Sequence, residues 1–359
     1  MALFGLFGKK EEKKNLRKGF HELNVKAIHS LTKESVKITF DVPQELSKAY
    51  SFQPGQYLDL IVSINGKEEH RSYSICSSTS EGLSIGVKAL ENGTVSKWLN
   101  GSLKEGESLV VSEPRGNFLL DEKAENIVLI AAGSGITPVL SMAKKTNDSA
   151  KKVRLIYGNR SESAIMFRDE IHALKNIQLI QFLSGEVKDG YRSGRMNKDN
   201  FTALIKEDLD LLKADAFYLC GPEEMIMDVR SALEFFGVRS EKIHFELFTT
   251  PVQMESTSKQ TVAGFEGTSK VQAILDGEKI SFDLDAKGAT LLEAADKAGL
   301  DAPYSCKGGV CCSCRAKVLK GSAMMKVNYA LTDEEVAQGY ILTCQAHPTS
   351  EELIFSYDD

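Results

Sequence analysis

Residues 126–142, NIVLIAAGSGITPVLSM, begin as an apolar strand pattern and pass through a glycine turn into a helical pattern. The turn holds Gly133 and Gly135, and Pro138 stands where the dinucleotide-binding fingerprint has its third glycine. Strand, glycine turn and helix come in the order that this fingerprint requires. We therefore predict that Gly133, Gly135, Thr137 and Pro138 bind a dinucleotide; an ordinary strand-to-helix turn is the alternative.

Three further apolar strand patterns follow this segment and alternate with helical stretches: VRLIYGN (153–159), IQLIQFLS (177–184) and AFYLCG (216–221). Parallel sheets with crossover helices produce this alternation, because both faces of their strands are buried. Residues 123–248 are therefore predicted to form an α/β nucleotide-binding domain with a parallel sheet.

The residues that follow these strands indicate which nucleotide the domain binds. Arg160 and Ser161 stand where a domain that binds NAD usually carries an acid for the ribose. The cation of Arg160 and the hydroxyl of Ser161 suit the 2′-phosphate of NADPH, so we predict that the domain binds NADPH rather than NADH. The acid Glu162 argues against this prediction, because an acid suits the ribose of NAD. Cys220 and Gly221 end the last strand, at the edge where open parallel sheets bind ligands.

Towards the N-terminus, residues 20–122 contain short β-rich runs separated by turn pairs, which predicts an antiparallel β-barrel. The run HRSYSICSS (70–78) combines a cation, an aromatic ring and hydroxyls, the groups that suit the pyrophosphate, ring face and reactive edge of a flavin. We predict that this domain binds FAD. The predicted FAD-binding residues are Arg71, Tyr73 and Ser74, together with Lys88, Gly93, Val95 and Ser96 at an expected phosphate-binding helix start.

Charge and the chain ends limit the expected partners and location. The 359 residues carry a net charge of −6 without a basic footprint, so no nucleic-acid partner is expected. Residues 1–19 combine one short apolar patch with charges, which predicts a disordered N-terminus without export signal or stable membrane insertion, and hence a cytoplasmic protein. Residues 249–268 are polar and lack periodicity, which predicts a linker to a C-terminal domain at 269–359.

Five of the seven cysteines lie between positions 306 and 344, which indicates metal or redox chemistry in a chain without an export signal. Cys306, Cys311 and Cys314 form C-x4-C-x2-C, and Cys344 follows thirty residues later, which is the plant-type [2Fe–2S] spacing. A zinc site is the alternative, although zinc sites usually repeat C-x2-C. Cys312 lies within this segment but does not belong to the ligand spacing. We interpret it as a thiol that does not bind the metal, and the spacing does not show whether it is reactive.

Two resemblances together cover nearly the whole chain. Four segments resemble the ferredoxin–NADP reductase family in order and spacing: PGQY (54–57), RSYS (71–74), GSGITP (133–138) and CGPEEM (220–225). The segments PYSCKGGVCCSC and LTCQAHP resemble a plant-type ferredoxin of the β-grasp class, which implies that the four spaced cysteines hold the cluster. The first resemblance implies that Cys220 lies beside the nicotinamide and that Phe248 stands in for the aromatic residue over the flavin. Tyr73, Ser74 and Cys220 are the expected catalytic residues.

The order of these parts, with the stretch KVNYALTDEEVAQGYILTCQAHP (326–348), resembles the reductase subunits of phenylacetyl-CoA epoxidases. This resemblance implies an NAD(P)H-dependent oxidoreductase that passes electrons through FAD and a [2Fe–2S] cluster to a di-iron oxygenase of phenylacetate catabolism. Alternative acceptors are a fatty-acid desaturase, another monooxygenase or an iron–sulfur reductase. A redox sensor or adaptor is the alternative from a different class.

Overall fold

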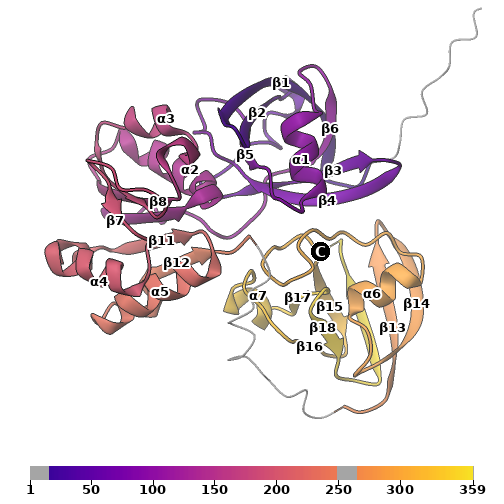
Figure 1. Ribbon diagram of the computed structural model, residues 1–359. Helices are drawn as coiled ribbons and strands as arrows, with labels where there is room; N and C mark the ends of the chain where they lie inside the picture. Colours follow the sequence, from indigo (N-terminus) through magenta and orange to yellow (C-terminus); the bar gives the residue numbers. More distant parts are fainter. Residues whose placement is uncertain (1–15, 249–264, 359) are drawn as a thin grey trace, which may run out of the picture.

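The computed structural model describes residues 16–248 and 265–358, which form three domains (Figure 1). Residues 1–15 of the predicted N-terminal tail and residues 249–264 of the predicted linker lie outside the described chain. Within the two described ranges, no helix is long and apolar enough to cross a membrane.

The N-terminal domain is a six-stranded antiparallel sheet that curls into the predicted barrel. Its strand order is β4-β3-β6-β1-β2-β5. The elements are β1 (Phe20–Thr32), β2 (Ser35–Asp41), β3 (Tyr57–Ile64), β4 (Lys67–Ser74), β5 (Ser84–Lys88), α1 (Thr94–Gly101) and β6 (Ser108–Ser112). A β-bridge between Ile75 and Ile85 joins the two edges of the sheet, next to β4 and β5. Apolar side chains such as Leu58 and Leu60, which alternate with polar ones along β3, are fully buried in the interior.

The second domain has the predicted parallel sheet, in the order β10-β9-β8-β7-β11-β12. Its strands are β7 (Asn126–Ala132), β8 (Lys152–Asn159), β9 (Ile177–Leu183), β10 (Arg192–Ser193), β11 (Ala216–Cys220) and β12 (Ile243–Glu246). Its helices are α2 (Ile136–Asn147), α3 (Arg168–His172), α4 (Lys198–Glu207) and α5 (Glu223–Phe235). Helices α2 and α3 cover one face and α4 and α5 the other (Figure 1), which explains why the central strands are apolar on both sides.

The C-terminal domain combines a five-stranded mixed sheet, in the order β14-β13-β19-β15-β17, with a two-stranded ribbon of β16 and β18. The strands are β13 (Thr268–Leu275), β14 (Glu278–Asp285), β15 (Arg315–Lys320), β16 (Ala323–Met325), β17 (Tyr340–Leu342), β18 (Ala346–Pro348) and β19 (Glu352–Ser356). The helices are α6 (Leu291–Lys297) and α7 (Asp333–Ala337). Thr332 and Glu335 form a capping box that starts α7, because each side chain accepts the other's backbone N–H.

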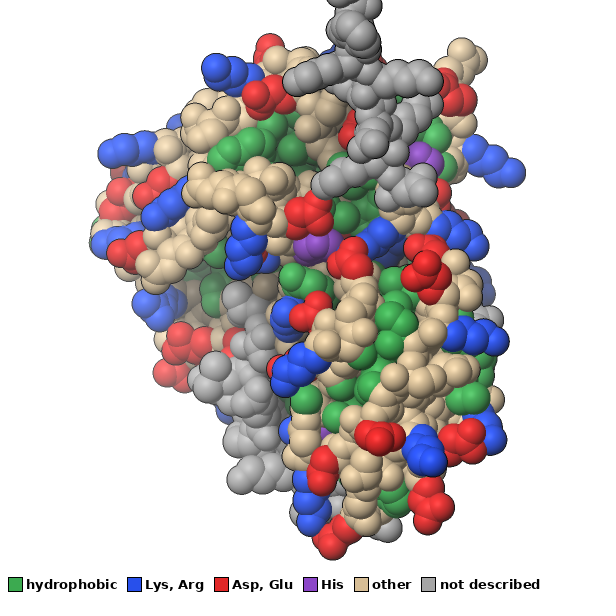
Figure 2. Space-filling model, turned by 90° about the vertical axis from the view of Figure 1, so that its right-hand side faces the viewer, with side chains coloured by type: hydrophobic (Ala, Val, Ile, Leu, Met, Phe, Trp, Pro, Cys, Tyr) green, Lys and Arg blue, Asp and Glu red, His purple; other side chains and the backbone are tan. Residues whose placement is uncertain are grey.

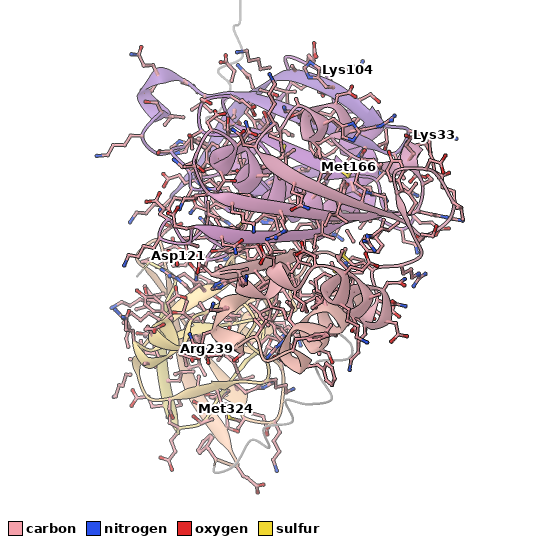
Figure 3. All side chains as sticks on the ribbon, turned by 90° about the vertical axis from the view of Figure 1, so that its left-hand side faces the viewer. Lys33, Lys104, Asp121, Met166, Arg239 and Met324 are labelled. Atoms are coloured by element: carbon pink, nitrogen blue, oxygen red, sulfur yellow. The ribbon has the colours of Figure 1, made fainter. Side chains whose placement is uncertain are left out.

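The C-terminal domain contacts both other domains. Val310 and Tyr329 pack against the hydrophobic core of the second domain. Figure 3 shows the barrel, marked by Lys104, and the C-terminal domain, marked by Met324, at opposite ends of the molecule. Charged side chains of both signs are scattered over the barrel and the C-terminal domain on the face shown in Figure 2. The cysteine segment, which lies between α6 and β15, faces the strands β3 and β4 of the barrel.

Candidate active site

All three domains contribute to one cavity of about 570 Å³. The barrel lines it mainly from β4, the second domain from the end of β12 onwards, and the C-terminal domain from the segment with the first cysteines. The lining residues with chemically relevant side chains are Arg71, Ser72, Ser74, Glu246, Phe248, Cys306 and Cys311. The predicted flavin motif and the predicted cluster segment therefore border the same space. Phe248, which was predicted to stack on the flavin, lines this cavity with 41% of its surface exposed.

Strand β4 presents different side chains to its two sides. Successive side chains of a strand point to opposite faces, and Ser72 of β4 lies opposite Asp59 of β3. Ser72 and Ser74 line the cavity, whereas Tyr73 packs against the hydrophobic core of the barrel. Of the predicted flavin-binding residues in this strand, the structure thus brings Arg71 and Ser74 to the cavity and places Tyr73 against the core.

The residues predicted to form a phosphate-binding helix start lie outside this cavity. Gly93 is the N-cap of α1, and Val95 and Ser96 are buried in the first turn of that helix. The Ser96 hydroxyl accepts the N–H of Leu90 at 3.1 Å, so its oxygen is used within the loop. Lys88, at the end of β5, lines a second cavity in the nucleotide-binding domain.

Glu246, which the sequence patterns missed, lies beside Ser74 and Cys220. Its Oε2 accepts a hydrogen bond from the Ser74 hydroxyl at 3.2 Å, and it pairs with Cys220 across the parallel strands β12 and β11. Burial raises the pKa of Glu246 to about 8, and the Ser74 hydrogen bond partly offsets this. Burial, followed by the charge of Glu246, raises the pKa of the Cys220 thiol well above its usual value. At neutral pH the three side chains are therefore a hydroxyl, a carboxylic acid and a thiol, all uncharged. One feature of the sequence could have revealed Glu246: it is an acidic residue within the otherwise apolar run IHFELF.

The glycine turn after β7 packs directly against the end of β11. A Cβ atom on Gly135 would lie 2.1 Å from the carbonyl oxygen of Cys220, so only glycine allows this approach. Gly133 has a φ of +54°, which glycine adopts readily. Thr137 and Pro138 are buried in the first turn of α2, and the Thr137 hydroxyl donates to the carbonyl of Ser134 at 3.0 Å.

The second cavity, of about 770 Å³, lies at the carboxyl ends of the parallel strands, where such sheets bind nucleotides. Gly133 and Arg160, both predicted to bind the nucleotide, line it, and so does Arg195, which the sequence patterns did not single out. Gly221 packs beside it, where a Cβ atom would lie 2.5 Å from the side chain of Met225.

The two residues after Arg160 form hydrogen bonds and ion pairs with other side chains of the domain. The Ser161 hydroxyl shares a hydrogen bond with Ser163 at 3.0 Å. Glu162, the residue that argued against a 2′-phosphate, forms ion pairs with Arg168 and Lys188 and accepts a hydrogen bond from Tyr191. The two cations compensate the charge of Glu162, and the uncharged Tyr191 hydroxyl adds a hydrogen bond.

The four spaced cysteines come together as two pairs. The Cys311 thiol donates to Cys306 with the two sulfurs 3.1 Å apart, and the Cys314 thiol donates to Cys344. The hydrogen bond from Cys311, followed by backbone N–H groups such as that of Gly308 at 3.3 Å, lowers the pKa of Cys306 to about 6. The hydrogen bond from Cys314 likewise lowers the pKa of Cys344. Each pair thus contains one thiol that ionises readily.

This arrangement fits a [2Fe–2S] cluster, which takes four thiolates, two on each iron. In the described parts of the chain, no three His, Cys, Asp or Glu side chains converge as a site for a single metal ion. Cys312 belongs to neither pair. Burial raises the pKa of its thiol to about 12, so it is a poor nucleophile.

Comparison with protein families identifies the three domains. Residues 22–119 match the oxidoreductase FAD-binding domain, residues 129–231 the oxidoreductase NAD-binding domain, and residues 273–349 the 2Fe-2S iron-sulfur cluster binding domain. Fold and cavities therefore define an NAD(P)H-dependent flavin reductase with its own iron–sulfur domain, whose cofactors are FAD, NAD(P)H and a [2Fe–2S] cluster.

Similarity to individual proteins identifies the family more specifically. The E subunit of the 1,2-phenylacetyl-CoA epoxidase of Escherichia coli (strain K12) is 38% identical over 351 residues, which cover 94% of this chain and 98% of that protein. The ferredoxin reductase component of the 3-ketosteroid-9-alpha-monooxygenase of Rhodococcus rhodochrous is 30% identical and covers 92% of this chain and 95% of its own length. The solved structure of phthalate dioxygenase reductase is 25% identical, with a TM-score of 0.58 over 94% of this chain and 98% of its own. The chain belongs to the family of three-domain reductases that includes the E subunit of the epoxidase.

Proposed function

We propose that this protein supplies electrons from NADPH to a di-iron oxygenase that epoxidises phenylacetyl-CoA. FAD, when bound, takes two electrons at a time from NAD(P)H and releases them singly, which suits the one-electron [2Fe–2S] cluster. The similarity to the E subunit of the bacterial epoxidase supports this acceptor. Other relatives are reductase components of a ketosteroid monooxygenase and a glycine betaine monooxygenase, so another oxygenase is the second candidate. Because NADPH is a cytoplasmic metabolite, we place the reaction in the cytoplasm.

One observation carries the proposal: a single cavity is bordered by the flavin motif, by the end of the nucleotide-binding sheet and by the first cysteine pair. The guanidinium of Arg71 is suited to the FAD pyrophosphate, and the Phe248 ring to the flavin face. The protonated Glu246 offers a hydrogen-bond donor to the reactive edge of the ring, and the Ser74 hydroxyl, which donates to Glu246, offers its oxygen as an acceptor. For Cys220, which pairs with Glu246 across β11 and β12, the proposed place is beside the nicotinamide. Cys306, Cys311, Cys314 and Cys344 are the proposed iron ligands.

The preference for NADPH rests on two guanidinium groups. Arg160 and Arg195 line the same cavity, and arginine pairs well with phosphate. Arg195 also forms an exposed ion pair with Glu224 at 3.3 Å. Arg195→Ala should raise the KM for NADPH by about ten- to a hundredfold, since a hydrogen bond to a charged group contributes about 1.5–3 kcal/mol. The KM for NADH is the internal control, and equal changes for both nucleotides would argue against a 2′-phosphate contact.

The central experiment is an absorbance titration of the purified protein with NADPH under nitrogen. We expect flavin and [2Fe–2S] bands that bleach with about three electrons per chain, two for the flavin and one for the cluster. A colourless protein loaded with zinc would refute the proposal.

The acceptor is tested by reconstitution with purified oxygenase components. The proposal expects epoxidation of phenylacetyl-CoA only when this reductase, NADPH and the epoxidase oxygenase are combined. A stearoyl-type desaturase assayed in parallel is the control for unspecific electron supply. Rapid NADPH-dependent reduction of cytochrome c would also argue against a sensor, as does the raised pKa of Cys312.

A further inference from the structure

The segment that carries the first cysteines is held to the barrel near both of its ends by one carboxylate. The Ser313 hydroxyl donates to Asp59 and lies 2.9 and 2.8 Å from its two oxygens. Before the first cysteine, the Ser305 hydroxyl lies 2.8 Å from the hydroxyl of Ser72, which donates to Asp59 at 2.6 Å. Asp59 thus connects to both flanks of residues 306–312.

Tyr57 adds an independent contact from the same face of β3. Its hydroxyl accepts the backbone N–H of Cys312 at 2.9 Å. The Tyr57 ring is buried, and a Cβ atom on Gly116 would lie 2.9 Å from it, so the ring has little room to move. Tyr57 therefore holds the last residue of the cysteine segment, next to the contact between Ser313 and Asp59.

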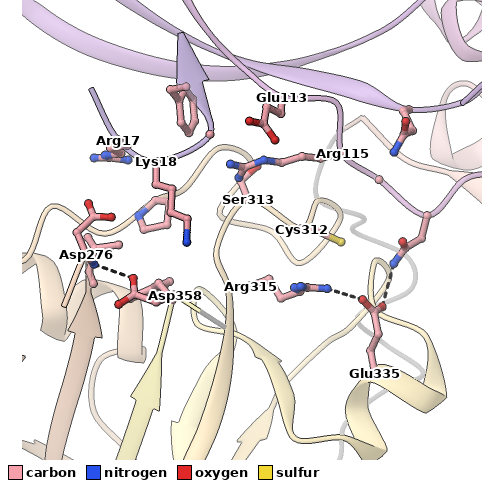
Figure 4. Close-up of a pocket in the computed structure, with 18 residues that line it drawn as sticks. Arg17, Lys18, Glu113, Arg115, Asp276, Cys312, Ser313, Arg315, Glu335 and Asp358 are labelled. Carbon is pink, nitrogen blue, oxygen red and sulfur yellow. Dashed lines mark hydrogen bonds and ion pairs between the residues drawn. The ribbon is translucent and has the colours of Figure 1, made fainter. Parts of the chain in front are cut away.

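Behind this segment the contact between the domains is hollow. A cavity of about 500 Å³ separates the barrel from the C-terminal domain, with Arg115 on the barrel side and Ser313 and Arg315 on the other (Figure 4). Beside this cavity the segment is hydrogen-bonded to Asp59 and Tyr57. Elsewhere the two domains also meet through the Arg17–Asp301 ion pair and through the stacked rings of His70 and Tyr304.

Asp59 is only 3% exposed, and a buried carboxylate is unfavourable unless it is paired and hydrogen-bonded. Within the barrel its side-chain partners are the Ser72 hydroxyl and the Arg115 guanidinium, the latter at 3.7 Å. The hydroxyl that contacts both of its oxygens comes from Ser313 of the C-terminal domain. In the docked molecule the buried carboxylate thus takes hydroxyl donors from both domains.

Resting on the proposed function, we propose that Asp59 is a positioning residue that fixes the cluster segment beside the flavin cavity and thereby sets the rate of electron transfer from flavin to cluster. With the cofactors bound, each NADPH oxidised would supply two electrons to the flavin; the cluster would take one of them and, once the acceptor protein had oxidised it, the other. No covalent bond forms or breaks in this step, and Asp59 itself neither gains nor loses an electron.

The test compares Asp59→Ala and Asp59→Asn with wild type in full-length, cofactor-loaded protein mixed rapidly with NADPH without oxygen. Flavin bleaching should be unchanged, because Asp59 lines neither the flavin nor the nucleotide cavity. Cluster bleaching should slow by about tenfold or more in Asp59→Ala, since small misplacements of reacting groups have large rate effects. Asp59→Asn should slow it less, because an amide still accepts from one hydroxyl and donates to the other.

The reduction potential of the cluster separates positioning from an electrostatic role. Removing a negative charge near the cluster makes its reduction easier, so a purely electrostatic role predicts faster bleaching in Asp59→Asn. Slower bleaching with an unchanged or raised potential supports positioning. A rate at or above that of wild type, or a slower rate with a lowered potential, overturns it.

Hydrogen exchange of the peptide 305–313 gives a readout that does not depend on turnover. It should increase in both Asp59 variants, and unchanged exchange would contradict the proposal. The control is Ser108→Ala, which removes a 2.7 Å hydrogen bond to Asn24 elsewhere in the barrel and should change neither exchange nor rates. If Asp59→Ala does not fold, Asp59→Asn still decides. A wild-type cluster that NADPH fails to bleach would refute the proposed function instead.

Discussion

Glu246 holds a proton that most glutamates release, because burial raises its pKa from 4.5 to about 8. Between these two values the native protein keeps the proton and the unfolded chain does not. Rising pH therefore favours unfolding across this window, and the effect levels off above about pH 8. The same proton keeps a negative charge away from the flavin cavity at neutral pH.

Flavin-free wild-type protein should consequently lose thermal stability as the pH rises through this window, and Glu246→Gln should remove that dependence. Thermal unfolding followed by circular dichroism at several pH values measures it. Glu241→Gln, at an exposed position just before β12, is the matched control and should keep the wild-type slope. Identical slopes for wild type and Glu246→Gln would show that Glu246 is ionised in the native protein.

Cys312 is expected to be inert despite its position among the iron ligands. Burial raises the pKa of its thiol to about 12, so the nucleophilic thiolate is scarce at neutral pH. Iodoacetamide should leave it unmodified in the native, cofactor-loaded protein, as peptide mass spectrometry would show. Cys312→Ser should reduce cytochrome c at close to the wild-type rate. Rapid alkylation at this position would reopen the sensor hypothesis.

The residues that the sequence located are those whose partners lie close along the chain. Cys306, Cys311 and Cys314 share one short segment, and Gly133 and Gly135 share one turn. Local spacing reveals such groups because a single loop has to supply them. Asp59 was missed because its partner Ser313 is 254 positions away, and no local pattern encodes a contact between domains.

At the scale of elements, the glycine turn after β7 depends on its contact with β11. Gly135→Ala would place a methyl group 2.1 Å from the Cys220 carbonyl, and backbone on both sides would have to shift. We expect a loss of stability of about 1–3 kcal/mol and weaker NADPH binding, measured by denaturant unfolding and by KM.

Gly101→Ala at the end of α1 is the matched control for that substitution. A Cβ atom there would have no neighbour within 4 Å, so unfolding and KM should stay close to wild type. If Gly135→Ala behaves like this control, the strand ends are not in contact as described.

Periodicity predicted the barrel and the parallel sheet, because each strand shows its burial in its own local pattern of apolar residues. It did not show which face of β4 meets the flavin. The alternation in HRSYS separates Ser72 and Ser74 from Tyr73, and only the pairing with β3 shows which set is buried in the core. Register across strands decides that question.

At the scale of the whole molecule, buried ion pairs join the barrel to the nucleotide-binding domain. Lys144 of α2, whose side chain is 6% exposed, lies 2.6 Å from Glu81 of the barrel and 2.5 Å from Glu170 of α3. Lys37 of β2 contacts Glu170 at 3.2 Å. The cluster of two lysines and two glutamates spans the seam between the domains.

Lys144→Ala should destabilise the protein by about 1–3 kcal/mol, because it leaves two carboxylates at the seam without their shared cation. Thermal unfolding measures the loss. The neighbouring exposed Lys145→Ala is the control and should have little effect. Equal stability of both variants would show that the ion pairs contribute nothing to holding the domains together.

Because the barrel and the iron–sulfur domain both line the flavin cavity, exchanging domains between related reductases would affect this contact. A graft that exchanges the C-terminal domain at residues 249–268 would replace Ser305 and Ser313 but keep Asp59, Ser72 and Tyr57 from the recipient. The two halves of the hydrogen-bonded contact would then come from different parents. A chimaera built this way would need strands β3 and β4 transplanted together with the iron–sulfur domain, because the functional unit crosses the boundary between them.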